Sequence, residues 1–192
     1  MKWKKRGVST IIATVLIILL TIAAAALLAQ FIVPYVKDSL SGSTECLNYR
    51  DYFQFKEKAG NNKENYNCYQ LSGSSELTKF YGASISAVGN DSSLDIKGFN
   101  LVFIKSDGST KPVRVIEEGK ARSGSEEGIK NLDPSSSNLK IPKTGETYTY
   151  SYNSLSKEDF VEMEVYPILK SDKICDLSDS IKLVNCAGIT LK

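Results

Sequence analysis

The chain has 192 residues, of which 24 are basic and 22 acidic, and it contains no histidine. Lys2, Lys4, Lys5 and Arg6 carry the excess of positive charge, since the chain from residue 8 onward has 20 basic and 22 acidic residues. This distribution argues against the extended basic surface of a nucleic-acid-binding protein, and the missing histidine removes the commonest general base and metal ligand.

An uncharged stretch follows the basic N-terminus, and from residue 8 to residue 33 it holds no glycine and no proline. As a helix, these residues reach about 39 Å, more than the roughly 30 Å hydrocarbon thickness of a bilayer. Basic residues before an apolar helix are retained on the cytoplasmic side. The sequence therefore predicts a membrane-spanning helix with the remainder of the chain outside the cell.

This helix is expected to continue beyond its apolar part. Pro34 removes a backbone hydrogen bond to Gln30 and should bend the helix there. The small polar tetrapeptide Ser41-Gly42-Ser43-Thr44 is expected to end it as a hinge. We therefore expect an assembly or transmembrane helix with hinge over residues 8–42 and a head domain over residues 43–192.

The head has the pattern of short strands. Tight turns and period-two alternation predict a series of strands at 49–55, 66–71, 80–88, 94–104, 113–116, 147–152, 161–165 and 181–184. Seven or eight strands without an amphipathic helix predict an antiparallel β-sandwich, Ig-like or similar, so the fold class of the chain is α+β.

Two local features refine this prediction. Asp107-Gly108 is typical of a tight hairpin, whereas residues 121–138 are rich in serine, glycine and charge and predict a long exposed loop. Tyr148, Tyr150 and Tyr152 share one face of their strand. We expect these three tyrosines to pack against the core, with an adhesive outer patch as the alternative.

The four cysteines, Cys46, Cys68, Cys175 and Cys186, all lie in the outer part, where an even number predicts two disulfides. Four cysteines allow three connectivities; the sequence-local choice is Cys46–Cys68 with Cys175–Cys186. A structural zinc site is the alternative, and the absence of histidine and of a C-x₂-C pair disfavours it.

No catalytic motif is visible: we find no Gly-x-Ser-x-Gly, no phosphate-binding glycine loop and no nucleophile beside a base. Asp172, Asp176 and Asp179 lie close in sequence, and a solvated acidic loop is a better interpretation than a calcium site. Asn90-Asp91-Ser92 is a possible glycosylation sequon at Asn90. We expect no enzyme activity, no cofactor and no metal.

The segment Lys4-Lys5-Arg6-Gly7-Val8-Ser9-Thr10 resembles the class III signal sequence of archaeal type IV pilins and archaellins. The resemblance implies that residues 1–7 are a signal peptide, that a prepilin peptidase cuts between Gly7 and Val8, and that the apolar helix stays in the mature protein. It covers residues 2–36 only. Bacterial pilins usually have glutamate five residues after the cut, where this chain has Ile12.

Ordinary secretion is one alternative, with Ala24-Ala25-Ala26 or Ala29 as the cleavage site. The apolar core is about twice the length of such a signal, which favours retention of the helix.

Thr10, Thr14 and Thr21 fall within about 40° of one another on a helical wheel. Small and hydroxyl residues at a helix interface allow close approach and interhelical hydrogen bonds. This pattern suits an assembly helix, although threonine and alanine are also tolerated in a plain membrane anchor.

Together these features predict a pilin-like subunit whose helix polymerises into an extracellular filament for adhesion or surface attachment. The expected partners are further copies of the chain, the membrane, the prepilin peptidase and the pilus assembly machinery, and no nucleic acid. The alternatives are a membrane-anchored extracellular binding module that does not polymerise and, less favoured, a tethered enzyme.

Overall fold

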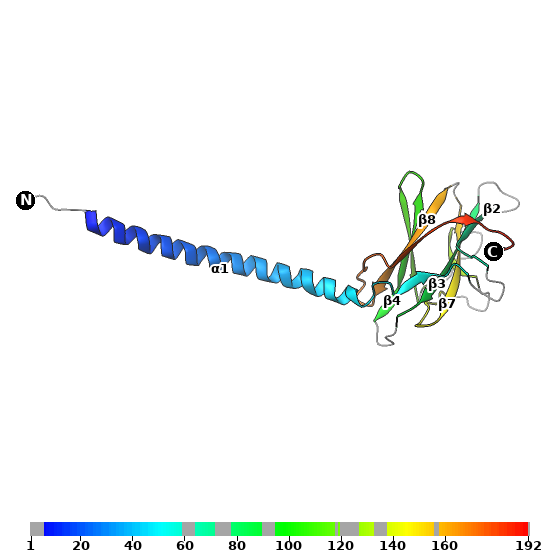
Figure 1. The fold of residues 1–192 in the computed structure, drawn as a ribbon, viewed down its shortest axis with the longest axis horizontal. Helices are drawn as coiled ribbons and strands as arrows, with labels where there is room; N and C mark the ends of the chain where they lie inside the picture. Colours follow the sequence, from blue (N-terminus) through cyan, green and yellow to red (C-terminus); the bar gives the residue numbers. More distant parts are fainter. Residues whose placement is uncertain are drawn as a thin grey trace, which may run out of the picture. The chain divides into compact units, whose positions relative to one another are not determined.

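The computed structural model describes residues 6–58, 64–71, 78–89, 95–117, 119, 127–132, 138–155 and 158–191. The chain begins with one long helix, α1 (Arg6–Leu47), within which side chains are described for residues 12–37 and 45–47. Pro34 lies inside this helix (Figure 1). The contacts between residues group the chain into two compact units, Met1–Glu45 and Cys46–Lys192.

The predicted hinge does not end the helix. The backbone stays helical through residues 41–44 and ends only at Leu47, so the expected boundary at residue 42 is wrong by about one turn. Glycine and serine disfavour a helix by no more than about 1 kcal/mol each. Cys46, which is buried in the head and disulfide-bonded, sets the end of the helix more strongly than this propensity.

The head consists of two sheets and is mainly antiparallel, as the strand pattern predicted. The strands are β1 (Phe53–Phe55), β2 (Cys68–Leu71), β3 (Lys79–Ala87), β4 (Ile96–Lys105), β5 (Thr110–Ile116), β6 (Gly128–Asn131), β7 (Thr147–Ser154), β8 (Phe160–Leu169), β9 (Asp179–Lys182) and β10 (Val184–Asn185). One sheet has the order β10-β2-β3-β7-β6, with β1 also paired to β3, and the other has the order β5-β4-β8-β9 (Figure 1).

The β4–β5 hairpin confirms the turn predicted at Asp107-Gly108. Gly108 has a φ of 83°, a conformation that side chains with a Cβ rarely adopt. The Asp107 carboxylate accepts a hydrogen bond from the Ser109 amide at 2.8 Å, which holds the turn.

Two strand predictions need correction. The segment 121–138, expected to be a loop throughout, contains the short edge strand β6, which pairs with β7 from Gly128↔Asn153 to Asn131↔Tyr150. The single strand expected at 181–184 is two strands separated by Leu183: β9 pairs with β8 in one sheet, and β10 pairs in parallel with β2 in the other. Both features depend on partners distant in sequence.

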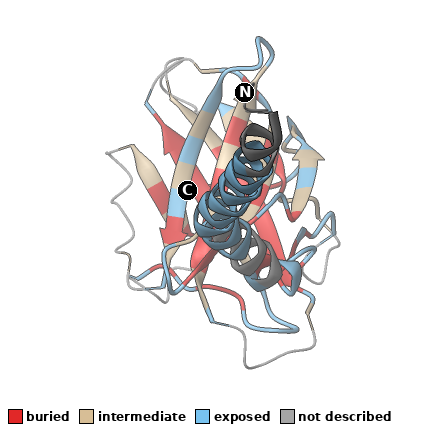
Figure 2. Ribbon diagram, turned by 90° about the vertical axis from the view of Figure 1, so that its left-hand side faces the viewer, coloured by how far each residue is buried: buried red, intermediate tan, exposed pale blue. Residues whose placement is uncertain are grey.

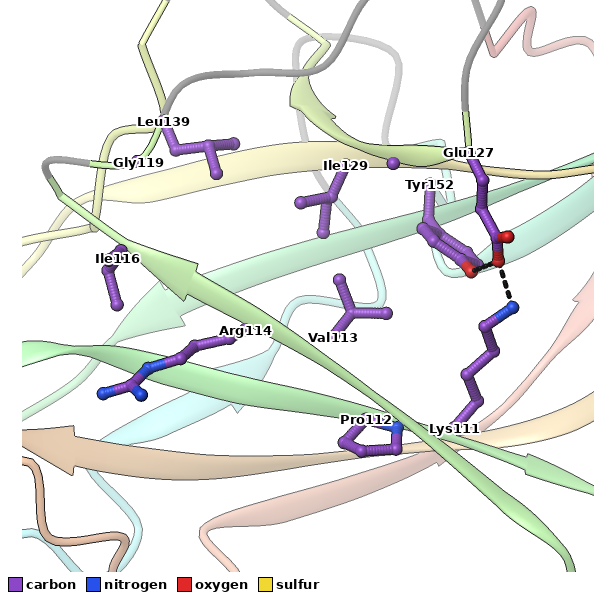
Figure 3. Close-up of a pocket in the computed structure, with 11 residues that line it drawn as sticks. Lys111, Pro112, Val113, Arg114, Ile116, Gly119, Glu127, Ile129, Leu139 and Tyr152 are labelled. Atoms are coloured by element: carbon purple, nitrogen blue, oxygen red, sulfur yellow. Dashed lines mark hydrogen bonds and ion pairs between the residues drawn. The ribbon is translucent and has the colours of Figure 1, made fainter.

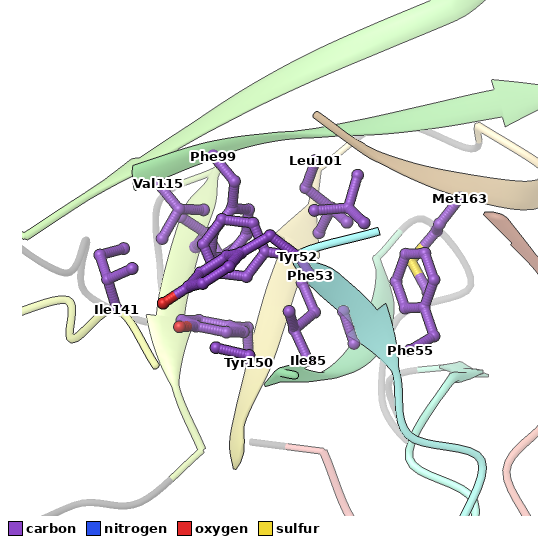
Figure 4. Packing of buried hydrophobic residues seen from close by; sticks show 14 of the residues in the cluster. Tyr52, Phe53, Phe55, Ile85, Phe99, Leu101, Val115, Ile141, Tyr150 and Met163 are labelled. Atoms are coloured by element: carbon purple, nitrogen blue, oxygen red, sulfur yellow. The ribbon is translucent and has the colours of Figure 1, made fainter. Parts of the chain in front are cut away.

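The core lies between the two sheets and is rich in aromatic rings. Phe99 on β4 lies with its ring centroid 5.0 Å from that of Phe53 on β1 and 5.4 Å from that of Tyr150 on β7 (Figure 4). Tyr152 stacks on Phe103 at 4.7 Å. Burial of each such side chain stabilises the fold by about 2–3 kcal/mol relative to exposure. The predicted burial of Tyr150 and Tyr152 is confirmed, and Tyr148 is half-buried against the same core.

Candidate functional site

The described side chains of Ile12–Lys37 on α1 form a long apolar surface. The segment Ile12–Lys37 has the length and apolar composition to cross a membrane, a test that a signal sequence near the N-terminus also passes. Every side chain described in this segment is exposed, including Leu20 at 72% and Phe31 at 74% (Figure 2). In water, such a surface is strongly unfavourable, so it requires lipid or protein around it.

The residues predicted to act in processing and assembly all lie on α1. Gly7, Val8 and Thr10 belong to its first turns, and their side chains lie outside the described residues, so the processing site stays a prediction. Thr14 is exposed. The Thr21 hydroxyl donates to the carbonyl of Ile18 at 2.8 Å, so its proton is used within its own helix.

All four cysteines form disulfides, but the pairing differs from the sequence-local choice. Cys46 pairs with Cys175 and Cys68 pairs with Cys186, over separations of 129 and 118 residues. The first bond joins the last turn of α1 to the segment between β8 and β9. The second joins β2 to the residue that follows β10. Tertiary packing therefore brings together the partners that are far apart in the chain.

The three aspartates considered for calcium have different surroundings. Asp172 forms ion pairs with Lys97, at 3.0 Å, and with Arg114, and these hydrogen bonds lower the pKa of its carboxyl group. Asp179 accepts a hydrogen bond from the amide of Phe55 at 2.8 Å, while Asp176 is exposed. Among the residues that the structure describes, no three His, Cys, Asp or Glu side chains gather as a metal site. Asn90 lies outside them.

A cleft of about 490 Å³ lies on the head between β5 and β6, which are edge strands of different sheets (Figure 3). Its wall includes the apolar side chains of Val113, Ile129 and Leu139. Arg114, which also lines it, is ion-paired with Asp172. The cleft therefore offers apolar contact and a guanidinium that already has a partner.

A charged network closes one end of this cleft. Lys111 forms an ion pair with Glu127, to which the Tyr152 hydroxyl also donates (Figure 3). Lys111 forms a second ion pair with Glu158 at 3.0 Å. Burial opposes the charge of Lys111, but the hydrogen bonds to the two glutamates outweigh burial and raise its pKa. The hydrogen bonds from Lys111 and Tyr152 lower the pKa of Glu127.

These opposite pKa directions describe a stabilised ion pair, whereas a general base needs a carboxylate with a pKa near neutrality. The network therefore ties the edges of the two sheets together. The sequence predicted only that Tyr152 packs against the core and did not single out Lys111 or Glu158, because β5 and β6 become neighbours only when the two sheets pack.

No protein-family model, curated protein or solved structure matches this chain. The resemblance of residues 2–36 to archaeal pilins therefore remains a prediction from sequence.

Proposed function

We propose that this chain is a structural subunit of an extracellular filament of the type IV pilus class, with the family resemblance to archaeal pilins as its basis in sequence. In this proposal a prepilin peptidase removes residues 1–7, and α1 of the mature subunit polymerises with α1 of other copies. The observation that carries the proposal is the apolar segment Ile12–Lys37, whose described side chains are all exposed.

The physical chemistry of α1 restricts how such a subunit moves. Transfer of the helix from lipid to water would expose more than about 1,000 Å² of apolar surface, at a cost of tens of kcal/mol. Between identical helices the same surface stays dry and gains dispersion contacts. Subunits therefore pass directly from the membrane into a helical bundle, for which the resemblance implies a dedicated ATP-driven assembly machine.

The head fits an extracellular role. Its two disulfides suit an oxidising compartment, and its two sheets enclose a hydrophobic core of the head's own residues. A contact between copies that does not close on itself produces an open helical filament, with the heads on its outside. We expect the filament to act in adhesion or surface attachment.

The proposal is tested by replacing Gly7 with valine in the natural host. Gly7→Val should block processing, because a side chain at the scissile bond hinders entry of the backbone into the peptidase cleft. Intact mass should show that the natural protein has lost residues 1–7, leaving 185 of its 192 residues, while the variant retains them. Electron microscopy of sheared surface material should show filaments only from the natural protein.

Gly42→Val is the matched control, since it makes the same change in the same helix outside the processing segment. The control should be processed normally. Abundant surface filaments from Gly7→Val, or an intact N-terminus on the natural protein within filaments, would contradict the proposal.

The second candidate is a membrane-anchored binding module that does not polymerise. The cleft between β5 and β6 favours it, because a concave site with apolar walls can hold a ligand. This candidate predicts an intact N-terminus and no filaments, and a secreted protein would begin near Gln30.

A further inference from the structure

The cleft between β5 and β6 is bordered by an open edge of β6. The Leu132 amide donates to the Thr149 carbonyl at 2.8 Å, which fixes the alternation of hydrogen-bonded and non-hydrogen-bonded pairs along β6 and β7. Ile129↔Tyr152 is accordingly a non-hydrogen-bonded pair, so the backbone N–H and C=O of Ile129 point away from β7. Neither group bonds to another residue that the structure describes.

These two backbone groups of Ile129 need a partner. Ile129 lines the cleft and is only 5% exposed. Buried backbone N–H and C=O groups are almost always paired, because an unpaired group costs about as much as a lost hydrogen bond. Water in the cleft can serve them, and a ligand that displaces this water must offer one acceptor and one donor side by side. One residue of an extended peptide offers both.

The free edge of β5 is less suited to such pairing. The Lys105 amide donates to the Ser109 carbonyl at 2.9 Å, so the same alternation places the backbone nitrogen of Pro112 at the free edge, where it has no hydrogen to donate. The Ile116 carbonyl, on the same edge, already accepts from the Gly119 amide at 2.9 Å. Proline in an edge strand protects it against strand addition. β6 is therefore the better edge for an added strand.

Residues 138–140 of the chain itself show what kind of ligand fits between these edges. The Leu139 amide donates to the carbonyl of Gly119, which follows β5, at 2.9 Å. The Asn131 side-chain amide, on β6, donates to the Asn138 carbonyl at 2.8 Å. An extended backbone thus bonds to both sides at one end of the cleft. Further along β6, at Ile129, no described backbone takes this place, so the fitting occupant is another stretch of polypeptide.

An added strand places a defined side chain in the cleft. The peptide residue opposite Ile129 has its side chain on the same face of the sheet as Ile129, which faces Val113 across the cleft (Figure 3). The walls at this place, Val113, Ile129 and Leu139, are aliphatic. The nearby Lys111 is already ion-paired with Glu127. The peptide residue that fits is therefore uncharged and aliphatic.

An edge strand of a second head does not supply this residue. The inward side chains of the edge strands, such as Ile129 on β6 and Val115 on β5, are buried in their own core. Only a segment that has no sheet of its own can turn an aliphatic side chain into the cleft of another molecule.

We propose that β6 accepts an extended segment of a separate partner protein as an additional strand, with an aliphatic side chain of that segment between Val113 and Ile129. Main-chain hydrogen bonds and one side-chain pocket are the usual basis of such strand addition. The head alone builds this site, so the inference does not depend on polymerisation of α1. For the second candidate function, it names the class of ligand.

Binding of a short blocked threonine peptide with one central leucine, measured on the full chain in detergent micelles, tests the proposal. Methylation of the leucine backbone nitrogen removes the donor to the Ile129 carbonyl and should weaken binding about tenfold. Methylation of the next threonine is the matched control, since alternate N–H groups of a strand point to opposite sides, and it should leave the affinity unchanged. No binding, or an equal loss from both methylated peptides, would overturn the proposal.

Amide hydrogen exchange, followed residue by residue, locates the bound peptide. In the free chain the Ile129 amide should exchange faster than the Lys130 amide, which pairs with Ser151 on β7, and the peptide should slow exchange at Ile129 about tenfold. Peptide binding that leaves exchange at Ile129 unchanged would contradict the proposed edge. Slower exchange at Ile129 with rising protein concentration, in the absence of peptide, would assign this edge to a second copy and overturn the separate partner.

A pair of substitutions on the β4–β5 hairpin tests the pocket. Val113→Phe narrows the cleft and should weaken peptide binding several-fold. Val102→Phe makes the same change on the other face of the hairpin, where Val102 lies opposite Pro112, and should leave binding unchanged. Equal affinity in the two variants would contradict the placement of the leucine.

The outcome is separate from the test of the proposed function, because Gly7→Val lies outside the head and should bind the peptide as the natural protein does. Peptide binding with no filaments on cells would defeat only the filament proposal. Filaments on cells with no peptide binding would defeat only the inference made here.

Discussion

At the scale of single residues, the tyrosines of β7 show how the head uses polar aromatic side chains. Tyr150 is buried between the sheets, and its hydroxyl donates to the carbonyl of Lys140 at 2.6 Å. Burial raises the pKa of Tyr150 well above its ordinary value. Burial, followed by the hydrogen bond to Glu127, also raises the pKa of Tyr152. The folded head therefore keeps both phenols neutral.

These shifts predict that the head loses stability in alkali. The unfolded tyrosines ionise near pH 10, whereas the folded ones remain protonated, so the contribution of Tyr150 and Tyr152 to the free energy of unfolding should be constant below pH 10 and fall as the pH rises above it. Thermal unfolding between pH 8 and pH 12, followed together with tyrosinate absorbance, checks this. Ionisation of all ten tyrosines near pH 10 in the folded protein would contradict it.

At the scale of elements, the two disulfides join segments that lie far apart in the chain. Their spans overlap, since Cys46 and Cys68 both precede Cys175 and Cys186. A cross-link over a long loop removes more entropy from the unfolded chain than a local one. The overlapping pairing therefore stabilises the head more than the two short loops expected from the sequence.

This pairing leads to a measurable prediction. Peptide mapping without reduction should link the Cys68 peptide to that of Cys186, and the double variant Cys68→Ser/Cys186→Ser should lose about 4 kcal/mol of unfolding free energy. Cys46→Ser/Cys175→Ser is the matched comparison at the end of α1. A Cys46–Cys68 peptide, or an unchanged stability in both double variants, would contradict the pairing.

At the scale of the whole molecule, the chain separates into a helical unit and a head with its own core. None of the described side chains of Ile12–Lys37 is buried, and the core clusters begin at Cys46. The head therefore has the contacts of an independent domain.

A fragment of residues 43–192 should fold as a soluble, disulfide-bonded domain. We expect a cooperative thermal transition, a near-ultraviolet circular dichroism spectrum of ordered aromatic rings, and a monomer in analytical ultracentrifugation. The full chain should require detergent or lipid under the same conditions. A fragment that stays unfolded after oxidation would show that the helix is needed to form the head.

The sequence by itself determined the elements whose cause is local. A long uninterrupted apolar run predicted α1, alternation predicted the strands and the inward face of Tyr150 and Tyr152, and Asp107-Gly108 predicted the hairpin turn. Each of these signals lies within a few neighbouring residues.

Tertiary structure alone decided the features that depend on distant partners. The helix continues through residues 41–44 to the buried Cys46, the cysteines pair across more than 100 residues, β6 exists through its ladder with β7, and the chain changes sheet at Leu183. In each case the favourable energy comes from contacts between segments remote in sequence, and this energy exceeds the weak local preferences on which sequence interpretation depends.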